Sequence, residues 1–242
     1  MRKNVDSNKV LLSDRKLIKQ KGFLNRIYTD FYNEFKNTKA PEGTLVEIGT
    51  GAGFIKEIIP KAITSDVIKG PDIDKVFSAE KIPFKNSSVS TFFMIDTLHH
   101  IKNPEKAFRE MERCLKRGGK IVMIEPYNSW WGYFIYKYLH YEHFDPKSDW
   151  KIQGEGRMSD SNTALPWIIF VRDRKIFEKK FPKLKITKIE PHTPFSYLLS
   201  GGLSKPQSLP TFTYGWVKGF ERFISPLNKY IGMFVTIELK KI

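Results

Sequence analysis

Two hydrophobic periods alternate along this chain and predict strands and helices in turn. Short β-branched or continuously apolar runs predict strands, at residues 44–48, 62–64, 75–77, 89–95, 121–124, 184–189 and 234–239. Apolar residues at helical spacing predict helices, over residues 9–37, 54–60, 104–115, 167–181 and 214–231. This alternation indicates an α/β fold, with a mostly parallel sheet and helices on both of its faces.

Two local features refine this outline. Gly118 and Gly119 directly follow the helix predicted over residues 104–115, and glycines at that place are expected to cap its C-terminal end. Only seven residues separate Asp66 from Asp74, whereas a parallel crossover normally takes a dozen or more and includes a helix. We therefore expect a loop in place of the helix there.

The composition is that of a globular protein, with 242 residues, 40% of them hydrophobic and 28% charged. The sequence contains no apolar run long enough for a transmembrane helix and no signal-peptide pattern at its start. Its single cysteine, Cys114, cannot form an internal disulfide, and no Cys/His cluster has zinc spacing. These features predict a reducing, cytoplasmic location and no bound metal.

The formal net charge of +15 is compatible with a nucleic-acid partner, an anionic membrane surface or a solvated lysine-rich surface. The basic residues are dispersed along the chain, with no block of five or more. This dispersion favours the solvated surface, and the charge by itself selects no partner.

The segment LVEIGTGAGF, residues 45–54, has the order strand, glycine turn and helix that presents backbone N–H groups to a ligand. Phe54 stands where the dinucleotide fingerprint has its third glycine, which disfavours NAD and FAD. No Gly-Lys-Ser/Thr follows, so the turn is not a P-loop. Asp66 lies 19 residues after Glu47, at the end of the next predicted strand, where a carboxylate can accept hydrogen bonds from two ribose hydroxyls.

These segments occur in a characteristic order with four others: AEKIPF at 79–84, DTLHHI at 96–101, the helix that begins NPEKAF at 103, and IVMIEP at 121–126. As a set they resemble the class I S-adenosylmethionine-dependent methyltransferases, in the type 11 methyltransferase-domain group. The resemblance covers about residues 44–126. It implies a Rossmann-like seven-stranded sheet within one domain, with a helical cap at 1–43, a cofactor-binding core at 44–126, and aromatic-rich substrate-side insertions at 127–165 and 191–232.

The resemblance also implies which residues bind S-adenosylmethionine. In the family, the glycine turn and the acid before it hold the methionine part, the acid after the second strand holds the ribose, and the AEKIPF region lies along the adenine. The residues that correspond here are Glu47, Gly49, Thr50, Gly51, Gly53, Asp66, Ala79, Glu80 and Asp96. Many relatives have an aspartate for the adenine amine where this chain has Ser78, so a backbone group or Glu80 is expected to substitute.

Methyl transfer is an in-line displacement that depends mainly on positioning, and a general base is optional. Three residues at the carboxyl ends of the central strands are candidates for a catalytic role: His99, His100 and Glu125. For the histidines, structural positioning or cofactor contact is favoured over proton transfer. Glu125 either orients the substrate or caps the loop that follows it.

The stretch EPYNSWWGYFIYKYLHYEHF, residues 125–144, is aromatic on nearly all sides of a helix, which suits a lid over an acceptor pocket. Its predicted substrate-side residues are Tyr127, Trp130, Trp131 and His140. The predicted function is methyl transfer to a small-molecule or lipid-like acceptor, with peripheral membrane contact as a secondary role of this stretch. The alternatives are an RNA methyltransferase and a cofactor-binding protein without catalysis.

Overall fold

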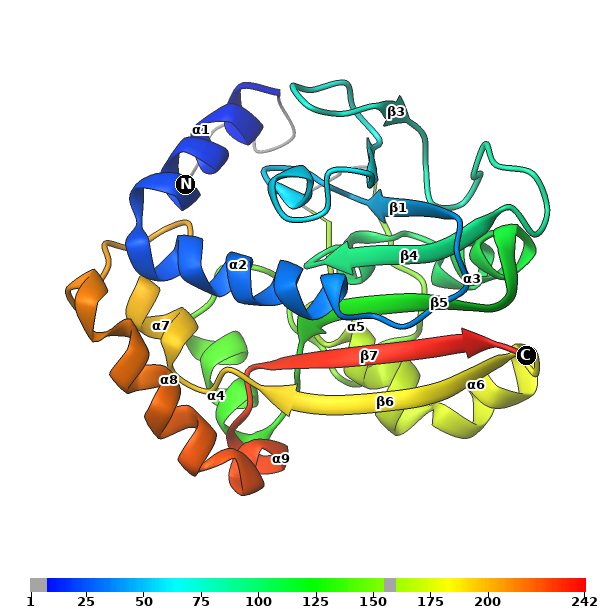
Figure 1. The fold of residues 1–242 in the computed structure, drawn as a ribbon. Coiled ribbons are helices and arrows are strands. Elements are labelled where there is room, and N and C mark those ends of the chain that lie inside the picture. The colour runs from blue at the N-terminus through cyan, green and yellow to red at the C-terminus, as the bar shows by residue number, and fades with distance from the viewer. Residues whose placement is uncertain (1–7, 155–159) are drawn as a thin grey trace.

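One seven-stranded sheet runs through the molecule between two groups of helices (Figure 1). The computed structural model describes residues 8–154 and 160–242. The strand order is β3-β2-β1-β4-β5-β7-β6, and β7 is antiparallel to both of its neighbours while β1 to β5 are parallel. This confirms the predicted α/β class and the mostly parallel sheet. The strands are β1 Thr44–Ile48, β2 Ile63–Asp66, β3 Lys75–Val76, β4 Val89–Ile95, β5 Leu115–Pro126, β6 Leu184–His192 and β7 Phe234–Lys241.

The helices of the described chain cover both faces of the sheet and the end at which the parallel strands terminate (Figure 1). Their bounds are α1 Asn8–Gln20, α2 Gly22–Lys36, α3 Pro104–Cys114, α4 Trp130–Tyr138, α5 Leu165–Trp167, α6 Arg174–Lys180, α7 Ser196–Ser200, α8 Tyr214–Phe223 and α9 Asn228–Ile231. None of them is both long enough and apolar enough to cross a membrane.

Alternate side chains of each central strand enter two separate hydrophobic cores. In β4, Phe92 and Met94 pack with α3 and α6, whereas Phe93 and Ile95 pack with α2 on the opposite face. Both faces of this strand are therefore buried, which explains its continuous apolar sequence. The N-terminal helices belong to the second core and cover the sheet beside the glycine turn.

The prediction that Gly118 and Gly119 cap the C-terminal end of α3 is wrong. The helix ends at Cys114, and Leu115 already has extended backbone angles and pairs with Val89 as the first residue of β5. Gly118, with φ +79°, instead lies in β5 opposite an irregularity in its pairing with β4, where the register shifts. A glycine is needed there because the extra residues of a bulge turn the backbone into the left-handed region.

The connection between β2 and β3 agrees with its prediction, whereas the helix predicted at 167–181 does not. The expected loop between β2 and β3 is present, because no helix lies between Asp66 and Lys75. The helix expected over residues 167–181 is interrupted. A π-helical turn spans Ile168–Arg172, Asp173 follows as its C-cap, and α6 begins at Arg174. Asp173 accepts a hydrogen bond from the indole of Trp150 at 2.9 Å, so this break also anchors the preceding loop.

Candidate active site

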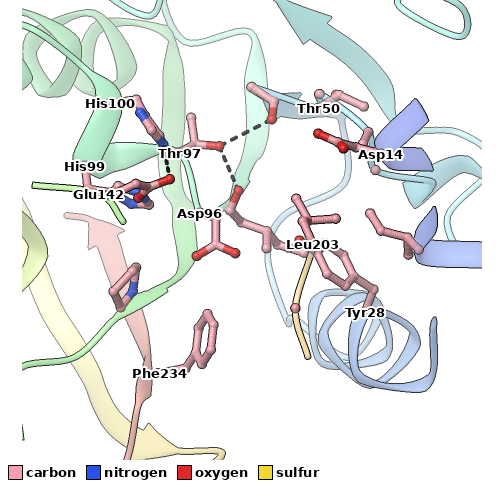
Figure 2. Close-up of a pocket in the computed structure, with 18 of the residues that line it drawn as sticks. Asp14, Tyr28, Thr50, Asp96, Thr97, His99, His100, Glu142, Leu203 and Phe234 are labelled. Carbon is pink, nitrogen blue, oxygen red and sulfur yellow. Dashed lines mark hydrogen bonds and ion pairs between the residues drawn. The ribbon is translucent and has the colours of Figure 1, made fainter. Parts of the chain in front are cut away.

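A cavity of about 560 Å³ lies at the carboxyl ends of β1, β2, β4 and β5, where open α/β sheets bind ligands. Helices α1 and α2, together with lining residues between 197 and 205, cover one side of the cavity, and residues 139–142 cover the other. In Figure 2, Asp96 projects between the side that holds His99 and Glu142 and the side that holds Tyr28 and Leu203. One cavity therefore joins the predicted cofactor residues to a second, more aromatic half.

The glycine turn adopts a backbone that only glycine accepts easily. Gly49 and Gly51 have φ values of +69° and +52°, in the left-handed region. A Cβ on Gly49 would lie 2.4 Å from the Thr97 side chain, and a Cβ on Gly53 would lie 2.2 Å from the Tyr32 hydroxyl. The turn is consequently packed between β4 and α2, with Gly51 at the cavity wall.

We predict that Gly49→Ala lowers the free energy of unfolding by about 2 kcal/mol or more, because it adds left-handed strain to the clash with Thr97. Urea denaturation measures this change. Gly219→Ala is the matched control, since Gly219 is helical and a Cβ there meets no atom within 4 Å. The control should be neutral or slightly stabilising, and equal losses in the two variants would contradict the account of the turn.

Asp66 ends β2 at the cavity wall, as the sequence predicted. Its Oδ2 accepts a hydrogen bond from the backbone N–H of Gly51 at 3.0 Å, and its Oδ1 accepts one from Ile68 at 3.3 Å. The carboxylate thus orients the glycine turn from inside the cavity. Carboxylate oxygens can accept further hydrogen bonds beyond these two, so Asp66 retains capacity for a ligand with paired hydroxyls.

Glu47, also at the cavity wall, is buried, and its Oε2 has no hydrogen-bond partner in the described chain. Burial raises the pKa of this carboxyl to about 7, against the opposing effect of hydrogen bonds with Thr50 and Tyr32. A buried acceptor without a partner is costly for the protein alone. Its presence beside the glycine turn indicates a ligand that brings a hydrogen-bond donor or a positive charge.

The residues that were predicted to lie along the adenine are at the cavity wall. Ser78, Ala79 and Glu80 all line the cavity. However, Oε1 of Glu80 accepts a hydrogen bond from the backbone N–H of Asn103 at 2.9 Å, which ties this loop to the start of α3. Glu80 therefore has a structural role beside the one that the sequence suggested for it.

Asp96 follows β4 and lies half-buried in the cavity with a φ of +49°, which is strained for a residue that is not glycine. Burial raises the pKa of its carboxyl to about 8; His99 opposes this shift, while Glu125 and Glu142 add to it. Thr97 stabilises the turn that follows, because its hydroxyl donates to the Ile95 carbonyl at 2.8 Å. Strain and a raised pKa at one cavity residue are typical of functional sites.

The three catalytic candidates form one connected group, but only the two histidines line the cavity. Glu125 is completely buried, and its Oε2 lies 2.8 Å from Nδ1 of His99. Its Oε1 accepts hydrogen bonds from the backbone N–H groups of Thr97 and Leu98 at 2.8 and 2.7 Å. Glu125 thus positions His99 and holds the backbone after β4 from behind the cavity. Of the two roles expected for it, this geometry is closer to capping a loop than to orienting a substrate.

The charge on His99 is set by two carboxylates. Burial lowers the pKa of His99, but the adjacent carboxylates of Glu125 and Glu142 outweigh burial and raise it to about 10. Conversely, His99 and the neighbouring histidines overcome the effect of burial on Glu142 and lower the pKa of that carboxyl to about 2. A raised pKa keeps His99 protonated near neutral pH, which does not suit a general base.

Among the predicted substrate-side residues, His140 lines the cavity but Tyr127, Trp130 and Trp131 do not. Trp130 is 80% exposed, and Trp131 donates its indole N–H to the Pro194 carbonyl at 3.1 Å. Helix α4 reaches the cavity wall through Ile135 and Tyr136, and its continuation at 139–142 also lines the wall. Trp130 and Trp131 lie on other sides of this helix, and aromatic content does not reveal which side of a helix faces a pocket.

The cavity also includes residues that sequence reasoning missed. They come from α1, α2, the segment after α4, α7, the loop after α7 and the start of β7, and they are Asp14, Tyr28, Glu142, Tyr197, Leu203 and Phe234. None lies in a motif. A helical cap at 1–43 was predicted, but no motif in it identifies Asp14 or Tyr28 as the residues that face the cavity.

Comparison with known proteins agrees with this geometry. Residues 46–123 match the family model of the methyltransferase domain. An uncharacterized protein of Methanocaldococcus jannaschii is 31% identical over 93 residues, a match that covers 34% of this chain and 44% of that protein. The chain thus aligns with less than half the length of this relative.

Solved structures share the fold over nearly the whole chain. A chain from the Haloferax volcanii complex with the Trm112 methyltransferase activator covers 100% of both chains at 14% identity and a TM-score of 0.54. A methyltransferase of Thermotoga maritima covers 89% of both at 18% identity and a TM-score of 0.51. A geranyl diphosphate methyltransferase solved with S-adenosylmethionine covers 95% of this chain and 90% of its own at 16% identity and 0.51.

At such low identities these structures establish the fold alone. Together with the family match, they define the class of fold: residues 46–123 match the methyltransferase-domain family, and the chain has the class I S-adenosylmethionine-dependent methyltransferase fold. This confirms the family resemblance that the sequence motifs indicated.

Proposed function

We propose that this protein binds S-adenosylmethionine and catalyses transfer of its methyl group to a small, lipid-like acceptor. One observation carries the proposal: the glycine turn, Asp66 and the unpartnered Oε2 of Glu47 open into the same cavity as an aromatic-walled second half. The cofactor half and the acceptor half meet at Asp96 (Figure 2). Bound there, the cofactor supplies an electrophilic methyl group on a sulfonium.

The residues present fit such a cofactor. Glu47 offers the unpartnered oxygen to an amino group, and Asp66 offers its carboxylate to the ribose hydroxyls. The backbone of the glycine turn allows close approach because Gly51 has open space where a Cβ would stand. Leu11, Ile18 and Tyr28 of helices α1 and α2 line the same cavity, and these apolar side chains exclude water on that side of it.

The second half of the cavity suits an apolar acceptor. Its walls include Ile135, Tyr136, Leu139, Tyr197 and Phe234, from four separate parts of the fold. Burial raises the pKa of Tyr136 and of Tyr197 well above the ordinary value, so both remain neutral hydroxyls. Such walls align a hydrophobic molecule and exclude water, which is the main requirement of an in-line displacement.

Cofactor binding should be linked to pH. The pKa values of Glu47 and Asp96 are raised by burial to about 7 and about 8, so both carboxyls are largely protonated at pH 6. A sulfonium favours their ionised forms, so its binding releases protons and strengthens as the pH rises. We predict that the ratio of affinities for S-adenosylmethionine and for S-adenosylhomocysteine, which lacks the sulfonium charge, rises about tenfold between pH 6 and 8. Calorimetry at several pH values measures it, and a constant ratio would contradict this linkage.

An exposed aromatic surface suggests where the acceptor comes from. It is defined here as Trp130, Phe134, Tyr138, Trp216, Phe220, Phe223 and Tyr230, on α4, α8 and α9. Trp130, Trp216 and Phe223 are 80%, 73% and 83% exposed. In Figure 1 the three helices lie together at the end of the sheet where β4 and β6 terminate. Exposed apolar patches of this kind mark interaction sites.

The aromatic surface is continuous and reaches the cavity. A chain of neighbouring rings begins at Phe220. The ring centroids are 6.3 Å apart for Phe220 and Phe195, 6.2 Å for Phe195 and Trp131, and 6.0 Å for Trp131 and Phe134. Phe134 in turn contacts Tyr138 at 5.6 Å, and the next three residues, 139–141, line the cavity wall. The aromatic surface therefore adjoins the cavity wall at residues 139–141.

The charges around the aromatic surface favour an anionic membrane as its partner. The exposed charged residues of α4, α8 and α9 are all basic: Lys137, Arg222 and Lys229. The single acid of these helices, Glu221, is buried and accepts hydrogen bonds from the backbone of Phe195 and Ser196. Aromatic rings among basic side chains match the headgroup region of an anionic bilayer. We therefore place the acceptor among membrane lipids.

Vesicle sedimentation tests this placement. Wild-type protein should bind vesicles that contain an anionic phospholipid more strongly than neutral ones, and Trp216→Ser/Phe220→Ser/Phe223→Ser should reduce binding at least about tenfold. The matched control, Leu12→Ser/Val76→Ser/Ile176→Ser, removes three exposed apolar residues outside the aromatic surface and should bind like wild type. Equal binding by both variants would overturn the placement. Two other results would also overturn it if the wild-type protein does not bind vesicles. The first is salt-sensitive retention on RNA, and the second is self-association that the aromatic-surface variant abolishes.

A further inference from the structure

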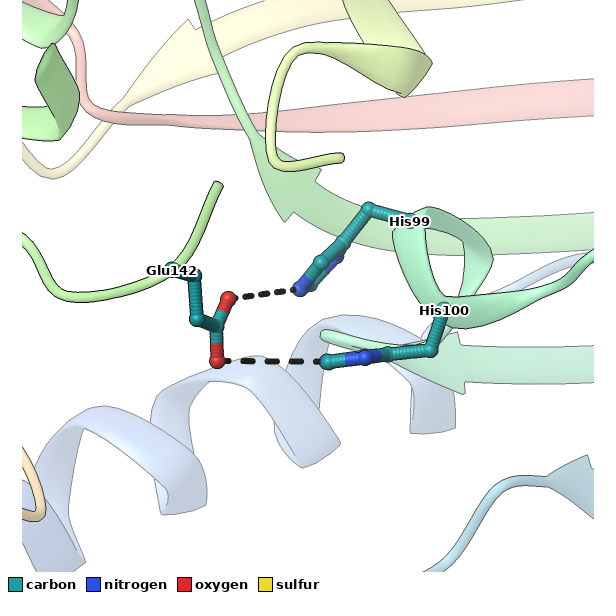
Figure 3. A group of neighbouring side chains, drawn as sticks. All are labelled: His99, His100 and Glu142. Carbon is teal, nitrogen blue, oxygen red and sulfur yellow. Dashed lines mark ion pairs between the residues drawn. The ribbon is translucent and has the colours of Figure 1, made fainter. Parts of the chain in front are cut away.

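Two imidazoles and one carboxylate converge at the wall of the acceptor half. His99 and His100 belong to a 3₁₀ turn, Leu98–His100, that follows β4, whereas Glu142 belongs to the segment after α4. Nε2 of His99 lies 3.4 Å from Oε2 of Glu142, and Nε2 of His100 lies 4.0 Å from its Oε1. Figure 3 shows the carboxylate facing both rings, with one oxygen directed to each. The three side chains can each offer one ligand atom within 4.8 Å of the others.

These separations suit a shared metal ion better than direct hydrogen bonds. An N–H···O bond usually spans about 2.7–3.2 Å between heavy atoms, which is shorter than either contact. Nitrogen and oxygen ligands lie about 2.0–2.2 Å from a zinc ion, so two ligands of a tetrahedral site are about 3.4 Å apart. The 3.4 Å contact between Nε2 of His99 and Glu142 equals such a ligand–ligand distance, and the 4.0 Å contact of His100 is somewhat longer.

The buried side of His99 supplies the support that metal-ligating histidines usually have. Its Nδ1 lies 2.8 Å from the Glu125 carboxylate, which two backbone N–H groups hold in place. This contact fixes the ring and directs Nε2 toward Glu142. A carboxylate that accepts from the second nitrogen of a ligating histidine is the usual outer partner of such sites.

The ligand types narrow the choice of metal, and the position of the cluster leaves room for a further ligand. Two imidazoles and one carboxylate suit zinc, iron, cobalt or nickel, whereas magnesium and calcium prefer oxygen ligands. All three side chains line the cavity, so a fourth position can open toward the acceptor half. Three protein ligands with one open position are the arrangement of a catalytic zinc site, whereas structural sites have four.

We propose that His99, His100 and Glu142 bind a divalent transition-metal ion in the acceptor half of the cavity. The binding itself follows from the side-chain geometry; its role rests on the proposed function. The ion would hold the polar head of the acceptor and lower the pKa of a hydroxyl or amine bound to it.

Metal titration of the full chain, without cofactor, tests the site. After treatment with a chelator, wild-type protein should bind one Zn²⁺ by calorimetry, and one Co²⁺ with the absorption bands of a four- or five-coordinate complex. His100→Ala and Glu142→Gln should each weaken binding at least about 100-fold. His143→Ala is the matched control, because His143 is exposed and outside the cluster, and it should bind like wild type.

Two results would overturn the proposal: no saturable binding by wild type, or equal affinity in wild type, His100→Ala and Glu142→Gln. Circular dichroism and binding of S-adenosylhomocysteine show whether each variant is folded. If Glu142→Gln is unfolded, Glu142→Ala takes its place, and if His100→Ala is unfolded, His100→Gln takes its place. The same binding measurement separates the two proposals. A protein that binds S-adenosylhomocysteine but no metal contradicts only the metal site, whereas one that binds metal but not S-adenosylhomocysteine contradicts only the proposed function.

Discussion

Asp66→Ala is expected to weaken binding of S-adenosylhomocysteine at least about 100-fold in calorimetry. The variant removes the carboxylate that faces the cavity and the acceptor for the Gly51 N–H. A hydrogen bond to a charged group contributes about 1.5–3 kcal/mol, so the loss of two such bonds to ribose hydroxyls accounts for a change of this size. The control, Asp149→Ala, alters an exposed aspartate outside the cavity and should leave the affinity unchanged.

Asp66→Asn separates ribose binding from support of the glycine turn. Asparagine keeps an oxygen that can accept from Gly51 but loses the negative charge, so we expect a weakening of about tenfold. Urea denaturation of both variants shows whether the turn has collapsed. An affinity for S-adenosylhomocysteine that stays at the wild-type value in folded Asp66→Ala would place the cofactor elsewhere.

Glu125→Ala should lower the free energy of unfolding by about 3–5 kcal/mol, which is the usual cost of breaking a buried ion pair by removing one partner. Glu125 is completely buried and joins the backbone of Thr97 and Leu98 to the ring of His99. Its removal leaves two backbone N–H groups and one imidazolium without this acceptor. Urea or thermal denaturation measures the loss.

Glu125→Gln is the informative companion to that variant. Its amide oxygen can still accept from Thr97 and Leu98, whereas its amide nitrogen cannot accept from His99. We expect it to recover about half of the lost stability, and to lower the pKa of His99, which ring-proton NMR can follow. If Glu125→Ala costs less than about 1 kcal/mol, the carboxylate does not organise this wall of the site.

The sequence predicted the sheet and the cofactor half because local patterns determine them. Strand Val89–Ile95 was predicted with its observed bounds, since a strand buried on both faces is apolar throughout. The glycines were predicted because a left-handed turn after a strand favours them, Asp66 because it ends the next strand, and Glu47 because the resemblance to class I methyltransferases implied its role. Gly118 shows the limit of such reasoning, because a glycine after a helix suits a cap or a bulge equally.

The acceptor half was less predictable because it depends on contacts between distant segments. Glu142 meets His99 only through the packing of the segment after α4 against β4, and a lone acid among aromatic residues gave no signal. For the same reason no metal site was expected: the two histidines and Glu142 have no ligand spacing in sequence. Trp130 and Trp131 failed as pocket residues because helix rotation, which the all-round aromatic pattern does not specify, sets which side faces the cavity.

The cavity is proposed to bind S-adenosylmethionine with an acceptor beside its sulfur. A crystal structure of the protein with S-adenosylhomocysteine is the sharpest test of this arrangement. The account predicts that the ribose hydroxyls contact Asp66, that the amino group contacts Glu47, and that the sulfur faces the half of the cavity lined by Asp96, His99 and Tyr136. An absence of binding in solution, or a cofactor bound outside this cavity, would contradict it.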